Sequence, residues 1–249
     1  MSVKDILVHV DTSLPSDSRL WLADQLASRF NAYLIGVGVD EDAPCLAAAK
    51  EKFTKLLQRD GLQGEWHMAM GGGAGYVARW ARDADLVILG QPDPAHPTGL
   101  DAPEDVILAC GRPALVIPYS GRLGRTGEYV LIAWNGSREA TRAAHDALPL
   151  MAISKSVTVF SVNPDDEKDE APGDDLIRHF ARHGVDATSE TLRTEELSPA
   201  EAVLSRAADV GADLIVMGAY SHSRLRETVL GGMTRDILKH MTVPVLMAH

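Results

Sequence analysis

The sequence predicts an α/β protein made of two tandem copies of one domain, each with a five-stranded parallel β-sheet flanked by helices. Two observations lead to this prediction. Three pairs of similar segments occur in the same order in the two halves, and strand-like apolar runs alternate with helix-like stripes in each half. The 249 residues leave each copy about 120 residues, which is a common domain size.

The repeated unit contains an apolar strand with a polar turn that ends in serine, a second strand that ends in glycine, and a closing strand that follows proline. These segments are KDILVHVDTS at 4–13, DADLVILG at 83–90 and RPALVIP at 112–118 in the first half, and EYVLIAWNGS at 128–137, GADLIVMG at 211–218 and VPVLMA at 243–248 in the second. Chance would rarely preserve the order of three matches, so the halves are interpreted as repeats.

Apolar runs of strand length predict five strands in each half. They lie at 5–10, 33–39, 65–70, 85–89 and 113–118, and again at 129–134, 156–162, 186–192, 213–217 and 243–248, with 65–70 and 186–192 the weakest. Continuous apolar runs are typical of strands buried on both faces of a parallel sheet. We therefore expect helices on both faces of each sheet.

Helical spacing fills the gaps between these strands. Apolar stripes are formed by Leu20, Ala23, Leu26, Ala27 and Phe30, by Ala140, Ala144, Ala147 and Leu148, and by Val203, Ala207 and Val210. The segment Ser198-Pro199-Ala200-Glu201 predicts a capping box with proline at the first helical position. Each half is therefore predicted to place four helices between its five strands.

The expected domains are residues 1–120 and 128–249. The linker between them, Ser120 to Gly127, is rich in glycine and basic residues that interrupt the apolar pattern. A further polar stretch, 163–175, is rich in acidic residues and proline and is predicted to be an exposed loop before a helix.

The composition argues against several kinds of partner. The formal net charge is -11 and the basic residues are dispersed, so we expect no binding to nucleic acid or to an anionic membrane surface. No apolar run approaches the roughly 18 residues of a membrane-spanning helix, and the N-terminal segment is too short and charged for a signal peptide. Cys45 and Cys110 lack Cys-x-x-Cys spacing and are predicted to be small buried side chains without a disulfide in a reducing compartment, the cytoplasm.

The ordered segments resemble universal stress proteins in their tandem form. The resemblance lies in a strand that ends in Asp-Thr-Ser or Asn-Gly-Ser, a later strand that ends in Asp-Leu-Ile-Val-Met-Gly, and a closing Val-Pro-Val-Leu strand, and it spans nearly the whole chain. It implies two Rossmann-like domains of the adenine nucleotide alpha hydrolase type and a non-enzymatic role in the stress response. In that family many domains bind ATP through a G-x2-G-x9-G-[ST] loop after the fourth strand, whereas others lack the loop and bind no nucleotide.

The second half keeps the spacing of this loop. Gly218 is followed by Ser221 in place of the second glycine and, after nine intervening residues, by Gly231, with Gly232 in place of serine or threonine. Backbone N–H groups at such glycines can approach a phosphate at a helix start, and Thr234 would add a hydroxyl group. The resemblance implies one ATP or AMP site formed by Ala133, Asn135, Gly136, Val162, Met217, Gly218, Ser221, His222, Gly231, Gly232, Met233 and Thr234.

The first half departs much further from the family loop. Segment 91–103 contains four prolines, which lack backbone donors, and no glycine at the motif spacing. Gly90 and Pro113 are 23 positions apart, against 26 between Gly218 and Pro244, so the loop is shorter. We expect this half to bind no nucleotide in the manner of the family.

The aspartate that ATP-binding members use near adenine and ribose shows the opposite trend. Asp11 retains it in the first half, whereas Asn135 replaces it in the second. Asparagine still accepts a hydrogen bond through its amide oxygen, but it lacks the negative charge. Neither half therefore carries the complete set of family residues.

Several other features have simpler interpretations. His179 and His183 have a spacing that could hold a metal, but no clear third ligand is near, so a solvated helical face is favoured. Segment 71–75 is glycine-rich but lacks G-x-G-x-x-G spacing, so a turn is favoured. His222 and Arg224 would place positive charge beside a phosphate, with an exposed loop as the alternative.

Catalysis is not expected. Ser13, Ser137 and Ser221 have no Gly-x-Ser-x-Gly context or ordered base, so we expect them to cap helices and close turns. An ATP hydrolase ranks last among the hypotheses, because no Walker lysine and no acidic pair stand near Gly218.

Two functions remain open after these exclusions. The first is a stress-response protein that binds an adenine nucleotide and acts through conformation and partners. The second is a ligand-free interaction module in which the loop is vestigial. In either case the closing strands, 113–118 and 243–248, would leave apolar sheet edges, so we expect the halves to form a pseudo-dimer within the chain, or two chains to form a homodimer.

Overall fold

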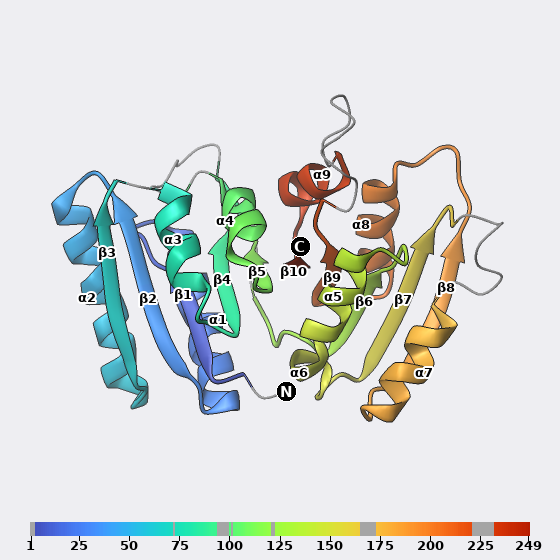
Figure 1. Cartoon of the computed structure of the whole chain (residues 1–249), viewed down its shortest axis with the longest axis horizontal. Helices are drawn as coiled ribbons and strands as arrows, with labels where there is room; N and C mark the ends of the chain where they lie inside the picture. The colour runs from blue at the N-terminus through green and yellow to red at the C-terminus, as the bar shows by residue number, and fades with distance from the viewer. Residues whose placement is uncertain are drawn as a thin grey trace. The chain divides into compact units, whose positions relative to one another are not determined.

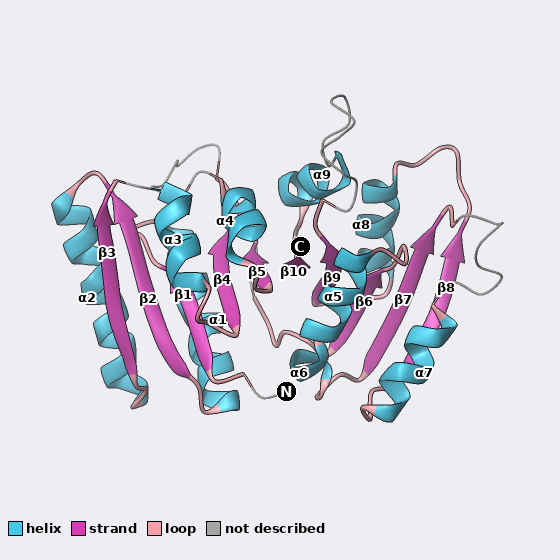
Figure 2. Cartoon of the chain, viewed as in Figure 1, coloured by secondary structure: helices cyan, strands magenta, loops and turns pink. Residues whose placement is uncertain are grey.

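The computed structural model describes residues 3–71, 73–93, 100, 102–120, 123–164, 173–220 and 232–249. The chain divides into two compact units, Met1–Leu123 and Gly124–His249. Each unit is an α/β structure in its own right (Figure 2).

The first unit contains a parallel sheet with strand order β3-β2-β1-β4-β5. Its elements are β1 (Asp5–His9), α1 (Leu14–Phe30), β2 (Tyr33–Asp40), α2 (Ala43–Asp60), β3 (Gly64–Met70), α3 (Gly73–Ala81), β4 (Leu86–Gly90), α4 (Pro103–Cys110) and β5 (Ala114–Ile117) (Figure 1). Helix α1 packs beside α2, and α3 packs beside α4. The central strand β1 is fully buried at Ile6, Leu7 and Val8, as its continuous apolar run predicts.

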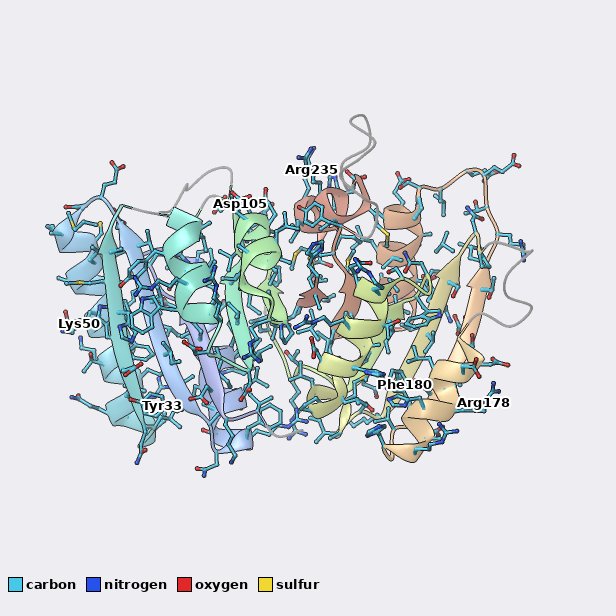
Figure 3. The ribbon with its side chains drawn as sticks, viewed as in Figure 1. Tyr33, Lys50, Asp105, Arg178, Phe180 and Arg235 are labelled. Carbon is cyan, nitrogen blue, oxygen red and sulfur yellow. The ribbon has the colours of Figure 1, made fainter. Side chains whose placement is uncertain are left out.

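The second unit repeats this topology with the order β8-β7-β6-β9-β10, again parallel throughout. Its elements are β6 (Tyr129–Ala133), α5 (Arg138–Asp146), α6 (Leu148–Met151), β7 (Ser156–Val162), α7 (Asp174–Arg182), β8 (Ala187–Leu192), α8 (Pro199–Asp209), β9 (Leu214–Gly218), α9 (Gly232–His240) and β10 (Val245–Ala248). Helix α7 shows the amphipathic pattern clearly, with Phe180 buried against the sheet and Arg178 exposed (Figure 3).

The predicted fold class is confirmed, including the two weakest strands. One helix prediction is wrong in detail: the stripe from Ala140 to Leu148 is split into α5 and the short α6. Pro149 causes the break, because proline has no backbone N–H and its ring clashes with the carbonyl four residues earlier, at His145. Cys45 is also not buried as predicted, since it lies half-buried in the first turn of α2, where its thiol donates to Asp42.

The start of α8 follows the predicted capping box. The Glu201 backbone N–H donates to Ser198 Oγ at 3.3 Å, and the Ser198 backbone N–H donates to Glu201 Oε2 at 2.9 Å. Pro199 needs no donor at the first helical position. These local bonds place the first turn of α8 at the end of the sheet where the strands finish.

The first strand of each unit ends in the same kind of turn. Asp11 Oδ1 accepts the Ser13 backbone N–H at 2.8 Å, and Asn135 Oδ1 accepts the Ser137 backbone N–H at 3.1 Å. Ser137 Oγ then caps α5 by accepting the Ala140 N–H, as expected, whereas the Ser13 hydroxyl donates to Asp11 instead.

Candidate functional site

A cavity of about 570 Å³ lies at the carboxyl ends of strands β6, β7 and β9 in the second unit. Strand β6 has β7 on one side and β9 on the other, so the chain changes direction across the sheet at this point. Open α/β sheets bind ligands at such switch points, and small-molecule cavities commonly span about 300–1,000 Å³. The position and size of the cavity therefore suit a small organic ligand.

The cavity wall is mostly apolar with a few polar groups. It consists of apolar Ala133, Val162, Pro199, Ala200, Val203, Met217 and Met233, aromatic Trp134, Phe160 and Tyr220, the glycines Gly218 and Gly232, polar Asn135, Asn163, Ser198 and Thr234, and the acidic Asp236. This composition is typical of sites that hold a flat apolar ring and orient it by a small number of hydrogen bonds.

Eight of the site residues that the family resemblance implies lie together in this wall. They are Ala133, Asn135, Val162, Met217, Gly218, Gly232, Met233 and Thr234. Gly136 was expected there but is not part of the wall; it has φ 68° and sits in the turn between Asn135 and Ser137. Ser221, His222 and Gly231 lie outside the described residues, as does Arg224.

Sequence reasoning missed the remaining wall residues, although some signals were present. Trp134 and Tyr220 adjoin expected residues in the chain, and Ser198 belongs to the capping box. Phe160 lies beside Ala133 in the sheet register, and Asp236 follows Thr234 by two positions on α9. These contributions depend on which strands and helices are neighbours, which the linear order does not state.

The end of β9 is shaped by a close contact with α5. A Cβ atom added to Gly218 would lie 2.4 Å from the backbone nitrogen of Ala140 and 2.6 Å from the carbonyl carbon of Glu139. Real Cβ atoms do not approach backbone so closely, so only glycine lets α5 pack here. Gly218 therefore has a structural reason to be glycine that is independent of any ligand.

The same strand end is linked to α9. Tyr220 has φ 56°, a left-handed conformation that is uncommon for a residue with a side chain, and its backbone N–H donates to Thr234 Oγ1 at 3.2 Å. Thr234 is only 3% exposed. Its hydroxyl oxygen is therefore already used as an acceptor, and its O–H group is what it could offer to a ligand.

The first turn of α9 lies in the cavity wall. A Cβ atom at Gly232 would meet nothing within 4 Å, so the backbone there is open to an approaching group. Backbone N–H groups of a first helical turn have no partner within the helix and attract anions. This end of the cavity is the one suited to a phosphate.

The opposite side of the cavity is held by Asn163. Its side-chain amide donates to the Thr194 carbonyl and accepts the Thr194 backbone N–H, both at 2.8 Å. Asn163 has φ 46°, a conformation that asparagine adopts more readily than most residues. The pair joins the end of β7 to the segment that leads into α8, and thereby positions the α8 residues of the wall.

The corresponding edge of the first unit is filled by side chains. The described residues there enclose about 10 Å³, beside His9, Arg19 and Gly90. Arg19 is 3% exposed, donates from Nε to the His9 carbonyl at 3.0 Å and forms an ion pair with Asp11. A Cβ atom at Gly90 would lie 2.3 Å from Arg19 Nη1, so the guanidinium packs directly on this strand end.

His9 adds to this filling. It occupies the position that Ala133 has in the second unit, as the paired registers of β1 with β2 and of β6 with β7 show. Burial, and next to it the charge of Arg19, lower the pKa of His9 to about 4, although Asp11 opposes the shift. For Asp11, burial alone would raise the carboxyl pKa, but Arg19, His9 and the bonds from Ser13 together hold it below its usual value.

Two other sequence features are not part of the cavity wall. His179 is half-buried, stacks on His145 with ring centroids 4.5 Å apart, and lies 4.6 Å from His183. The described residues include no group of three His, Cys, Asp or Glu side chains placed to hold a metal ion. Gly71 has φ 73° and lies in the turn between β3 and α3, whereas Gly73 and Gly75 already belong to α3, so the described part of the glycine-rich segment forms a strand-to-helix turn and the start of a helix.

Comparison with known proteins places the second unit in a family. The model of the universal stress protein family matches residues 128–249. Universal stress protein Slr1230 of Synechocystis is 41% identical over 46 residues, which are 18% of this chain and 16% of that protein. Universal stress protein MJ0577 of Methanocaldococcus jannaschii is 37% identical over 49 residues, which are 20% of this chain and 30% of that protein. The matched stretches thus span less than a third of either relative.

Solved structures extend the likeness of fold to the whole chain. A universal stress protein from Archaeoglobus fulgidus superimposes with a TM-score of 0.76 at 14% identity, covering 99% of this chain and 96% of that one. The functionally unknown protein PA1789 from Pseudomonas aeruginosa gives a TM-score of 0.71 at 18% identity, covering 99% of this chain and 92% of that one.

None of the helices that the structure describes is both long and apolar enough to cross a lipid bilayer. The family match to the second unit, the repeated topology of the first and the full-length likeness of fold lead to one conclusion. The chain belongs to the universal stress protein family, in its tandem two-domain form.

Proposed function

We propose that this universal stress protein binds one adenine nucleotide, ATP or AMP, in the cavity of the second unit. The observation that carries the proposal is the 570 Å³ cavity at the sheet's switch point, whose wall includes eight of the site residues that the family resemblance implies. The loop could have lost its ligand and served only as a connection. A cavity of ligand size favours a retained site instead.

The two ends of the cavity suit the two parts of a nucleotide. Trp134 and Phe160 provide aromatic surface near the end of β6 and β7, where a base can stack or lie edge-on. Gly232 and Thr234 provide open backbone and a hydroxyl group at the start of α9, where a phosphate is favoured. The expected orientation therefore places the adenosine near Asn135 and the phosphate against α9.

The filled edge of the first unit supports a stoichiometry of one. Arg19 and His9 are buried in the space beside Gly90, and Arg19 is held there by its ion pair with Asp11. A ligand would have to displace a buried, paired guanidinium, which costs several kcal/mol in general. We expect one nucleotide per chain.

The role that follows is binding rather than turnover. We infer that nucleotide occupancy changes the conformation around the end of β9 and α9, and so the partners that the protein engages. A cytoplasmic location suits this role.

Isothermal titration of the purified full chain with ATP and AMP tests the proposal. cAMP and dAMP, with which two universal stress proteins have been solved, complete the set of probes. Gly232→Val should reduce affinity at least about tenfold by covering backbone donors, a loss of about 1.4 kcal/mol. Gly75→Val is the matched control, because a Cβ atom there also meets nothing within 4 Å but lies in α3 of the first unit.

The results separate the candidate functions. Binding of one nucleotide that Gly232→Val weakens and Gly75→Val leaves unchanged supports the site. No binding at millimolar nucleotide would favour the ligand-free interaction module. Two nucleotides per chain, or equal effects of both variants, would show that the site is placed wrongly.

A further inference from the structure

The cavity wall is electrically uneven from one end to the other. Asn135 and Asn163 are neutral at the β6 and β7 end, whereas Asp236 contributes a carboxylate at the α9 end. Among the described wall residues, Asp236 is the only acidic one, and none is lysine, arginine or histidine. The fixed negative charge therefore lies at the end where a phosphate group is expected.

Asp236 has no compensating partner in the described part of the chain. Its neighbour Arg235 is exposed on α9 and does not line the cavity (Figure 3). The hydroxyl oxygen of Thr234, two positions before it, accepts a hydrogen bond from the Tyr220 backbone N–H. Hence the carboxylate acts on a ligand without a neutralising cation among these residues.

The effect of such a carboxylate depends on the charge of the ligand. The start of α9 attracts a single phosphate through its free N–H groups, an attraction that falls off within the first turn. Asp236 lies just beyond that turn and repels each added phosphate by a Coulomb term that grows with ligand charge. A nucleoside feels no net repulsion, a monophosphate with its charge of about −2 feels an intermediate repulsion, and a triphosphate feels most.

We propose that Asp236 makes this site select nucleosides and nucleoside monophosphates over triphosphates. The inference rests on the proposed nucleotide site and narrows its ligand class by charge. It assigns Asp236 a role in specificity, since the carboxylate discriminates among ligands that share the same base and ribose.

Titration of adenosine, AMP and ATP into the full chain, without divalent cations and at about 0.15 M salt, tests the proposal. Asp236→Asn should raise the affinity for ATP by about threefold to tenfold, for AMP by less, and for adenosine by less than about twofold. Asp236→Lys should raise the three affinities in the same order and by larger factors, which provides a second readout. Asp186→Asn is the matched control, because Asp186 is an exposed aspartate just before β8, at the opposite edge of the sheet.

Each result bears on the proposal in a distinct way. A gain that increases with ligand charge in the Asp236 variants, and not in Asp186→Asn, supports it. Equal changes for all three ligands, or none, would overturn it while the proposed nucleotide site stands, since the ligands still bind. No binding of any ligand to the unchanged chain would instead remove the proposed site and this inference with it.

Magnesium provides a final discrimination. Neutralising the triphosphate with Mg²⁺ should shrink the difference between the unchanged chain and Asp236→Asn. If Mg²⁺ instead makes the unchanged chain bind ATP more tightly than Asp236→Asn does, the carboxylate anchors a cation, and the charge-selection proposal is wrong.

Discussion

The backbone N–H of Tyr220 donates to the Thr234 hydroxyl oxygen at 3.2 Å, and this bond joins the end of β9 to the first turn of α9. It satisfies a backbone donor on a residue held at φ 56°. The two residues both line the cavity, so one hydrogen bond sets the relative position of two parts of its wall.

Thr234→Val should weaken the second unit, because it keeps the shape of the side chain but removes the acceptor for Tyr220. The expected loss in the free energy of unfolding is about 1–2 kcal/mol, measured by urea denaturation. Thr234→Ser keeps the hydroxyl group and should lose less. Equal losses in both variants would assign the effect to the methyl group instead.

Gly218→Ala should destabilise the second unit more than Gly232→Ala does. The added methyl group at Gly218 would collide with the backbone of α5, whereas at Gly232 it meets nothing within 4 Å. Overpacking of this kind costs about 1–3 kcal/mol, which thermal and urea denaturation would detect. Indistinguishable stabilities would mean that α5 shifts without cost, contrary to the contact seen here.

Stability of the first unit should fall as the pH is lowered, because of His9. Burial lowers its folded-state pKa to about 4, so between that value and the unfolded-state pKa of 6.5 the unfolded chain binds more protons. The contribution of His9 to the free energy of unfolding is complete above pH 6.5 and is lost progressively below that pH. The loss is about 2 kcal/mol from about pH 7.5 to about pH 5. His9→Gln should reduce this pH dependence, as measured by urea denaturation at both pH values.

The exposed His240 provides a control for the removal of one imidazole. His240→Gln should leave the pH dependence close to that of the unchanged chain. Asp11 does not affect the comparison between about pH 7.5 and about pH 5. Because its folded-state pKa is lowered, its contribution to the free energy of unfolding is lost only below about pH 3.8. A His9→Gln chain with an unaltered pH dependence would contradict the prediction.

Arg19→Met should destabilise the first unit strongly, because it leaves the Asp11 carboxylate buried without its guanidinium partner. Removal of one member of a buried pair costs about 3–5 kcal/mol. Adding Asp11→Asn to Arg19→Met should recover part of the loss, since it removes the stranded charge. A double variant no more stable than Arg19→Met would show that packing, not charge, dominates.

The sequence predicted the strands of both units because their signals are local. Continuous apolar runs mark β1 and β6, and the serine three residues before Glu201 marks the start of α8. The split of α5 from α6 also has a local signal, since Pro149 directly follows Leu148, the last residue of the stripe. Cys45 was misplaced because an apolar composition does not say which side of a helix faces the core.

For the site, the sequence by itself determined the residues of the family loop, the turns at Asp11 and Asn135, and the contrast between a glycine-rich and a proline-rich segment. Those features depend on backbone conformations that a few adjacent residues dictate. Only the tertiary structure decided that the second unit has a cavity of ligand size while Arg19 and His9 fill the edge of the first. Whether space stays open depends on side chains from strands and helices that are distant in the chain but pack against one another. No local sequence pattern predicts those contacts.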